Sequence, residues 1–411
     1  MLAPLKRRDF RALWTGMAVS LLGDGIFLVA VAWQAYAISD HPSALALIGV
    51  ATSAPQVAFL LLGGAFSDRF SRRAVLFWAD ATRAVAVAVL SALVAGGHAR
   101  LFELCLAGAV IGTATAFASP AFEALVPQLV PEAELTQANA VEQFVRPGAI
   151  QLAGPALGGV AVAVLHPWGS FALDGATFAF SAFCTLRISV LPTAAPSNHA
   201  SLWAEVAEGL RYVRGQVWLW GTFVSATFTY LLFIGPTQVL LPYIVRNSLH
   251  KGASTYGAVL AVGGAGALIG AVASARRRHP GRPMVWIYGW WALATLAVAG
   301  YGLATNAWGL ACAAAVINGA EVAGAVMWTT VKQRRVVNSM LGRVSSIDWC
   351  ISTALLPLSY ALTAPVAQAL GARRALVAAG VLGAAVTLGF LLLPGMRTNE
   401  RRVAVWSSGR T

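Results

Sequence analysis

The sequence predicts an all-α membrane protein with twelve transmembrane helices arranged in two six-helix halves. Of its 411 residues, 58% are hydrophobic and only 11% are charged, whereas a soluble domain carries about 25% charged residues. Apolar runs of about 20 residues, the length of helix that crosses a bilayer core, recur along the whole chain. Basic residues gather in alternate breaks between these runs. These three observations predict the fold class and its topology.

Turn-forming residues separate the apolar runs and set the expected helix boundaries. Gly, Pro, Ser, Asp and His interrupt the apolar sequence at 39–43, 96–98 and 166–169, for example. The first run is too long for the apolar part of a signal peptide, so it is expected to be the first spanning helix. The expected helices cover residues 12–39, 44–66, 74–95, 101–121, 138–165, 168–190, 217–245, 255–275, 283–303, 307–329, 344–369 and 375–394.

The distribution of Lys and Arg predicts the orientation of these helices. With the N-terminus in the cytoplasm, 22 Lys and Arg residues fall on the cytoplasmic side and five on the other side, while Arg83 and Arg146 fall within helices. Short loops that remain in the cytoplasm are enriched in these residues. The asymmetry predicts a multi-pass protein of the cell membrane with both termini cytoplasmic. It also explains the net charge of +13 without a nucleic-acid partner.

The longest break between apolar runs divides the chain into two halves, as in transporters that bind their substrate near the middle of the membrane. Within this break, Leu202, Val206, Leu210 and Val213 recur at helical spacing, which predicts an amphipathic helix lying on the membrane surface. The expected domains are an N-terminal half at 1–190, a cytoplasmic linker at 191–216, a C-terminal half at 217–395 and a cytoplasmic tail at 396–411.

A charged stretch separates the second and third expected helices. Residues 63–73 read Gly-Gly-Ala-Phe-Ser-Asp-Arg-Phe-Ser-Arg-Arg. Because two bilayer-length apolar runs flank it, this stretch is expected to form a tight loop at a membrane face. Gly64 lies four residues before Asp68, so both fall on one side of a helix end, where glycine allows close helix approach. An ordinary cytoplasmic loop would also explain the three arginines, Arg69, Arg72 and Arg73.

This loop is expected to act as a gate between the two halves. Asp68 would lie against the N-terminus of the helix that begins near Arg343, where a carboxylate gains ~0.3–1 kcal/mol. Arg72 or Arg73 would pair with Glu123, the acid at the cytoplasmic end of the fourth helix. The alternative is that Asp68 only neutralises the neighbouring arginines.

Two carboxylates in the middle of expected helices are candidates for energy coupling. Asp24 lies between two glycines, and Glu321 follows Asn318-Gly319 in the tenth helix. An ionisable group inside a bilayer costs at least ~2.5 kcal/mol on insertion scales, so each acid needs a partner or a function. A buried carboxylate can load and release one proton per transport cycle; the alternative is a structural acid in a polar seam between helices. Both acids are expected to border one central cavity.

The same cavity is expected to hold the substrate. Gln34, Gln151 and Asn318 are candidate polar groups in its wall, although single amides also serve as hydrogen-bonding contacts between helices. Asp174 lies closer to the outer face and is expected to be structural. A wall of aromatic and aliphatic residues with few polar groups suits a bulky, partly apolar molecule better than a sugar.

No catalytic or metal-binding pattern accompanies these residues in the sequence. The four cysteines lie inside apolar runs and the six histidines lie in the breaks between them, without metal-ligand spacing or a nucleophile–base arrangement. An intramembrane transferase would need paired acidic motifs for a magnesium diphosphate, which the sequence lacks. The chain is therefore expected not to be an enzyme and to need no cofactor. The protonation sites proposed above make the proton gradient its expected energy source.

The motifs resemble those of the major facilitator superfamily along the whole chain. The loop at 63–73 resembles the superfamily's signature between helices 2 and 3, with Ser71 in place of its second glycine. The fifth helix resembles the motif associated with antiporters through Gly154, Pro155, Gly158 and Gly159. The fourth helix lacks the arginine of the signature linked to proton transfer. The segments around Asp9, Asp24 and Asp348 resemble the branch that contains the enterobactin exporter and macrolide-efflux proteins.

This resemblance implies a monomeric secondary active transporter in the lipid bilayer. It would export a drug, siderophore or secondary metabolite in exchange for protons by alternating access, and thereby confer drug resistance where the substrate is a drug. Uptake or facilitated transport of a small nutrient or lipid-like solute is the alternative within the same class. A membrane partner or sensor that transports nothing is an alternative from another class.

Overall fold

The computed structural model describes residues 4–131, 134–135, 137–138, 145–189, 202–276 and 282–396. Within these ranges the chain is helical, without β-strands. The N-terminal half contains η1 (Pro4–Lys6), α1 (Arg8–Ile38), α2 (Pro42–Arg69), α3 (Arg72–Ala95), α4 (Leu101–Leu129), the π-helical η2 (Gly148–Ala153) and α6 (Gly154–Leu186). The remainder contains α7 (Leu202–Arg214), α8 (Val217–Tyr243), the π-helical η3 (Ile244–Ser248), α9 (Ala253–Arg276), α10 (Pro283–Leu303), α11 (Ala307–Arg335), α12 (Asn338–Thr353), α13 (Leu356–Leu370) and α14 (Ala372–Phe390).

Eleven continuous segments of the described chain are long and apolar enough to cross a membrane, and one of them is long enough to cross it twice. The segment Val145–Leu186 has 42 residues, about 63 Å of helix at 1.5 Å per residue, twice the thickness of a bilayer core. Its backbone leaves the helical conformation at His166, where φ is 59°, just before Pro167. The two parts are the expected fifth and sixth helices, so the chain makes the predicted twelve passes.

The second helix ends later than the sequence predicts. α2 continues through Arg69, and only Phe70 and Ser71 separate it from α3. The charged residues of the expected loop therefore form the last turn of a helix and the first turn of the next one. Polar residues extend a helix readily once it has left the apolar core. The side-chain oxygen of Ser71 caps α3 by accepting a hydrogen bond from the backbone N–H of Ala74 at 3.4 Å.

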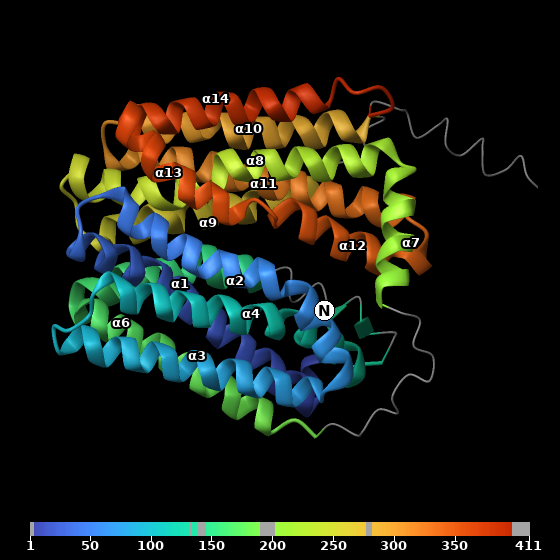
Figure 1. Ribbon diagram of the computed structural model, residues 1–411, viewed down its shortest axis with the longest axis horizontal. Helices are drawn as coiled ribbons and strands as arrows, with labels where there is room; N and C mark the ends of the chain where they lie inside the picture. Colours follow the sequence, from blue (N-terminus) through green and yellow to red (C-terminus); the bar gives the residue numbers. More distant parts are fainter. Residues whose placement is uncertain are drawn as a thin grey trace, which may run out of the picture.

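The helices form two bundles that lie side by side, α1 to α6 in one and α8 to α14 in the other (Figure 1). The helix α7 crosses one end of the molecule, where η1 and the start of α1 also lie. We call this the linker end, and we call the opposite end, where α1 finishes at Ile38, the far end.

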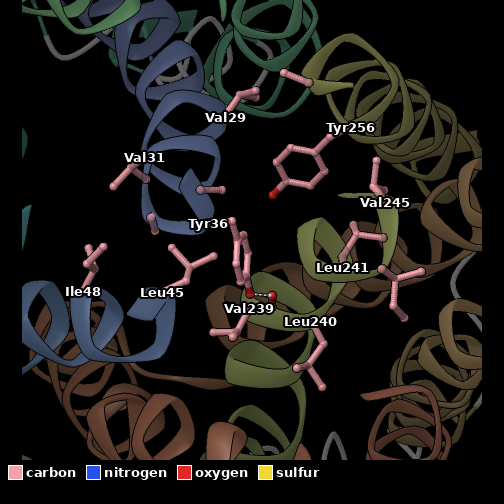
Figure 2. Close-up of a cluster of buried hydrophobic side chains, with 14 of the residues drawn as sticks. Val29, Val31, Tyr36, Leu45, Ile48, Val239, Leu240, Leu241, Val245 and Tyr256 are labelled. Atoms are coloured by element: carbon pink, nitrogen blue, oxygen red, sulfur yellow. Dashed lines mark hydrogen bonds between the residues drawn. The ribbon is translucent and has the colours of Figure 1, made fainter. Parts of the chain in front are cut away.

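Buried apolar side chains form three clusters, and their membership differs between the two ends. At the far end one cluster joins both halves, with Val29 to Tyr36 of α1 packed in the same core as Val239 to Val245 and Tyr256 (Figure 2). At the linker end each half has its own cluster, one around Phe10 and one around Trp328. The two halves therefore share a core at the far end and keep separate cores at the linker end.

The amphipathic helix forms as predicted, but its described residues pack on protein. Leu210 and Val213 belong to the core of the C-terminal half at the linker end, and the Glu208 carboxylate pairs with Arg343 of α12 at 2.6 Å. Part of the apolar stripe that predicts a helix on the membrane surface thus packs against α12, and contact of this helix with the membrane stays a prediction. One end of the linker is fixed to the second half.

Close packing of α2 on α4 depends on glycine, which gives a first prediction. A Cβ atom at Gly112 would collide with the carbonyl oxygen of Thr52, and overpacking of this kind costs typically about 1–3 kcal/mol. Gly112→Ala is therefore expected to lower the thermal unfolding temperature of the protein purified in detergent.

Gly289→Ala on α10 is the matched control. A Cβ atom there meets no atom within 4 Å, and alanine favours a helix over glycine by about 1 kcal/mol. Equal unfolding temperatures for the two variants would contradict the assignment of Gly112 to a close helix contact.

Candidate functional site

Two cavities lined by ionisable side chains lie within the bundles, one in each half. The cavity of the N-terminal half has a volume of about 120 Å³, and that of the C-terminal half about 210 Å³. Asp24 lines the first and Glu321 the second. The sequence predicts that both acids border one central cavity; in the structure they line separate cavities, because the residues of each lining come from one half alone.

The cavity of the N-terminal half holds two acids and two arginines. Asp24 of α1 lines it together with Asp80 and Arg83 of α3, and Arg146 precedes η2. The Arg83 guanidinium pairs with the Asp80 carboxylate at 2.5 Å. The hydroxyl of Ser181 on α6 donates a hydrogen bond to the other Asp80 oxygen at 2.7 Å. The network joins α3 to α6 beside Asp24.

Asp174 belongs to the same polar region, although the sequence suggested a place nearer the outer face. Its side chain is fully buried, and its Oδ1 lies so close to Gly23 of α1 that a Cβ atom there would collide with it. The hydroxyl of Thr177 lies 3.4 Å from this oxygen. Gly23 precedes Asp24, so α6 presents a second buried acid to the same turn of α1.

The cavity of the C-terminal half combines three ionisable groups with an aromatic wall. The Lys332 ammonium pairs with the Asp348 carboxylate at 2.9 Å. The same carboxylate accepts hydrogen bonds from the Trp328 indole at 3.0 Å and from the Ser352 hydroxyl at 3.2 Å. Glu321 lines the same cavity from the midpoint of α11. The aromatic residues of the wall are Tyr230, Phe233, Trp291, Trp328 and Trp349.

The three amides predicted as cavity residues do not line either of these cavities. Asn318 packs between α11 and α9, where its side-chain nitrogen would collide with a Cβ atom at Gly263. Gln151 lies in η2, and its backbone carbonyl approaches Gly264 of α9 just as closely. Gln34 is half-buried in the last turns of α1. Residues 151 and 318 thus lie at contacts between helices, and the buried amide oxygen of Gln151 has no hydrogen-bond partner among the described residues.

The glycines of the fifth helix pack against two different partners. Gly154 lies against Gly25 of α1, where a Cβ atom would come within 2.8 Å of the Gly25 Cα. Gly159 faces α9 of the other half, where a Cβ atom would come within 3.1 Å of the Gly257 Cα. Gly158 packs against Ile26 of α1. Pro155 begins this part of α6, and its carbonyl also approaches Gly257.

The structure describes only some of the side chains of the predicted gate between the two halves. For Gly64, Asp68 and Arg69 the structure gives the helical backbone of α2, while their side chains lie outside the described residues. The Arg72 guanidinium donates a hydrogen bond to the carbonyl of Ala124 at 2.9 Å, in the turn of α4 that carries Glu123. Its pairing with Glu123 stays a prediction.

Arg73 is held at the end of a different helix. Its guanidinium donates hydrogen bonds to the carbonyls of Thr185 and Leu186 at 3.1 and 2.6 Å, where the last carbonyls of α6 need donors and a positive charge is favoured. These bonds join the start of α3 to the end of α6. Arg73 thus has a structural role within the N-terminal half.

The sequence-based candidates did not include five of the ionisable groups that line the cavities. The sequence alone could have predicted one of these pairs: Asp80 and Arg83 are three residues apart in an apolar helix, and residues at this spacing share a helix face. The other members come together only through tertiary packing of separate helices. These five are Asp80, Arg83, Arg146, Lys332 and Asp348. Within the described ranges, no three His, Cys, Asp or Glu side chains are grouped as metal ligands.

Polar contacts across the two halves accompany the shared core at the far end. The Tyr36 hydroxyl of α1 donates a hydrogen bond to the carbonyl of Val239 on α8 at 2.6 Å (Figure 2). The Arg246 guanidinium of η3 donates to the carbonyl of Trp33 at 3.3 Å and lies 3.8 Å from the Asp40 carboxylate. These bonds close the far end more specifically than apolar packing alone.

Comparison with protein families gives one match over almost the whole chain. The model of a family described as transmembrane secretion effector matches residues 1–407. Among curated proteins, the chain is 26% identical over 278 residues to the uncharacterized MFS-type transporter YfiS of Bacillus subtilis, covering 66% of this chain and 65% of that protein. It is 25% identical over 237 residues to macrolide efflux protein A of Streptococcus pyogenes, covering 57% of this chain and 58% of that protein.

A third relative aligns along most of its length. The chain is 25% identical over 384 residues to the enterobactin exporter EntS of Citrobacter koseri, covering 91% of this chain and 90% of that protein.

Two solved structures share the fold. A bacterial homologue of the iron transporter ferroportin, in an inward-facing state, has a TM-score of 0.71 at 15% identity over 94% of this chain and 99% of that one. The nucleoside transporter NupG has a TM-score of 0.65 at 10% identity over 92% and 98%.

The buried pair of Lys332 and Asp348 gives a second prediction. Removing one partner of a buried ion pair leaves an uncompensated charge, which costs about 3–5 kcal/mol, whereas removing both is often neutral. Lys332→Met and Asp348→Asn are each expected to lower the unfolding temperature of the purified protein, and the double variant to recover much of the loss. A double variant with the summed loss of the two single variants would contradict an ion pair buried in the fold.

Proposed function

Because this chain belongs to the transmembrane secretion effector family of major facilitator superfamily transporters, we propose that it exports a bulky, partly apolar small molecule in exchange for protons. The observation that carries the proposal is the shared core at the far end together with separate cores at the linker end. Two bundles that share a buried core at one end and have separate cores at the other, among the described residues, fit alternating access between two faces. The relatives named for macrolide efflux and enterobactin export support the direction.

The linker end is proposed to face the cytoplasm. The basic residues Lys6 and Arg7 lie there before α1, and Lys332, Arg334 and Arg335 lie there at the end of α11, as expected for the cytoplasmic face. In this orientation we assign the structure to the state from which an exporter takes up its substrate. In the other state, Asp68 and the start of α12 are proposed to close the linker end.

Asp24 is proposed to carry the coupled proton. It lies near the midpoint of α1, in a cavity whose other ionisable groups are Asp80, Arg83 and Arg146. A guanidinium favours the charged form of a nearby carboxylate, and loss of that contact favours the protonated form. A proton bound to Asp24 thus changes the charge balance of the first half and biases one conformation over the other. Glu321 lines a separate cavity, and we assign it to the substrate.

The test of coupling is the substitution Asp24→Asn. The amide keeps the shape of the side chain and cannot bind and release a proton, so transport against a gradient is expected to stop. The measurement is accumulation of a labelled macrolide in cells, with and without a proton uncoupler, normalised to the amount of protein in the membrane. Asp24→Glu, which keeps a titratable group, is expected to retain part of the transport.

The same assay tests the direction. Export predicts lower accumulation with the wild-type protein than without it, and loss of this difference when the uncoupler is added. Higher accumulation with the wild-type protein would instead support uptake, the alternative function. Wild-type accumulation ratios in Asp24→Asn would show that Asp24 does not carry the proton.

Closure of the far end is tested by Tyr36→Phe. This change removes the hydrogen bond across the halves to Val239, a net contribution of about 0.5–1.5 kcal/mol, and is expected to shift the equilibrium toward far-end opening roughly 2- to 10-fold. The measurement is the distance distribution between spin labels at His41 and Lys251, two exposed positions at the far end of the two halves.

A matched control is available in Tyr288→Phe. The Tyr288 hydroxyl donates to Thr222 at 3.1 Å within the C-terminal half, so its loss leaves the contact between the halves intact. Longer label distances in Tyr36→Phe alone are expected. Identical distributions in both variants would rule out a role of the Tyr36 bond in far-end closure.

A further inference from the structure

The cavity of the C-terminal half contains an acid without a partner. Glu321 makes no hydrogen bond or ion pair in the part of the chain that the structure describes. Its position at the midpoint of α11 puts it where an uncompensated charge is most expensive. A binding partner that enters and leaves the cavity is one way to satisfy such an acid.

The charge balance of this cavity differs from that of the other half. The lining of the N-terminal cavity contains two acids and two arginines and is neutral overall. The lining of the C-terminal cavity contains two acids and one lysine, a formal excess of one negative charge. Lys332 is paired with Asp348, eleven residues along α11 from Glu321, about 16 Å of helix. The excess charge therefore resides at Glu321.

Aromatic rings surround the same cavity. The Trp291 indole nitrogen lies against α11 at Gly324, where a Cβ atom would come within 2.5 Å of it. Gly324 follows Glu321 by three residues, so the two lie on one face of the helix and Trp291 lies beside the acid. The faces of indole and phenol rings attract cations, and rings arranged around a cavity recognise quaternary ammonium groups.

From these observations we propose that this cavity binds an organic cation, the protonated or quaternary amine of the transported molecule. The proposal rests on the transport function and names the substrate class of the same site. Glu321 supplies the opposite charge, and Trp291, Tyr230 and Trp349 supply aromatic surface in the cavity wall. The cavity volume of about 210 Å³ is below the ~300–1,000 Å³ of pockets that hold drug-sized ligands. It therefore takes the amine-bearing part of a larger molecule.

The test is binding of benzyltrimethylammonium to the purified full-length protein in detergent, measured by isothermal titration calorimetry. Phenylacetate, which carries a negative charge on the same aryl group, is the comparison ligand. Wild-type protein is expected to bind the cation and to bind phenylacetate at least tenfold more weakly. Absence of cation binding, or equal binding of the anion, would overturn the proposal.

Three variants locate the site. Glu321→Gln is expected to raise the Kd of the cation at least tenfold, and Glu321→Asp, which keeps the charge, to raise it less than threefold. Trp349→Leu is expected to raise it a few-fold; this side chain is 65% exposed, so its loss leaves the fold intact. Glu103→Gln removes an acid that caps the start of α4 and is expected to leave the Kd unchanged.

An unchanged Kd in both Glu321→Gln and Trp349→Leu would overturn the site assignment. If Glu321→Gln fails to fold, Glu321→Asp and Trp349→Leu still decide between the outcomes. The experiment uses no proton gradient. Transport that is insensitive to the uncoupler would therefore contradict the proposed proton coupling. It would leave the proposed cation site untouched, because that site is tested by the binding measurement alone.

Discussion

The contact between α6 and α9 is one of the two most extensive helix contacts that join the halves, the other being that between α2 and α13, and the position of α1 depends on it. Gly159 and Gly257 bring the two backbones into direct contact. Burial of apolar surface does not drive helix association in lipid, so small residues that allow close packing stabilise such contacts. The opposite face of α6 packs on α1 through Gly154, next to Gly25. The segment that joins the halves thus also positions the turn of α1 that carries Asp24.

Much of the fold could be predicted from the sequence, because each pass of a membrane helix leaves a bilayer-length apolar run. Boundaries were less predictable. The charged end of α2 extends the helix to Arg69, since charged residues end an apolar run without ending a helix. The break at His166 was predictable because Pro167 and Gly169 follow it.

The candidate site was predictable only in part. Asp24 and Glu321 were recognisable because a single acid in an apolar run stands out. Their separation into two cavities was not, since it depends on which way each helix faces within its bundle. Asp80 was overlooked although it forms an ion pair with Arg83, and the partnership of Lys332 with Asp348 joins two helices whose proximity no local pattern records.

The shared core at the far end has a thermodynamic consequence. Opening that end would bring the apolar side chains around Tyr36 and Val239 into contact with water, and hydration of apolar surface raises the heat capacity. Closing the linker end would bury other surface and lower it. Any heat-capacity difference between the two states therefore measures how much more apolar one seal is than the other. The hydrophobic contribution to the far-end seal weakens on cooling, so temperature itself acts on the balance between the two faces of the membrane.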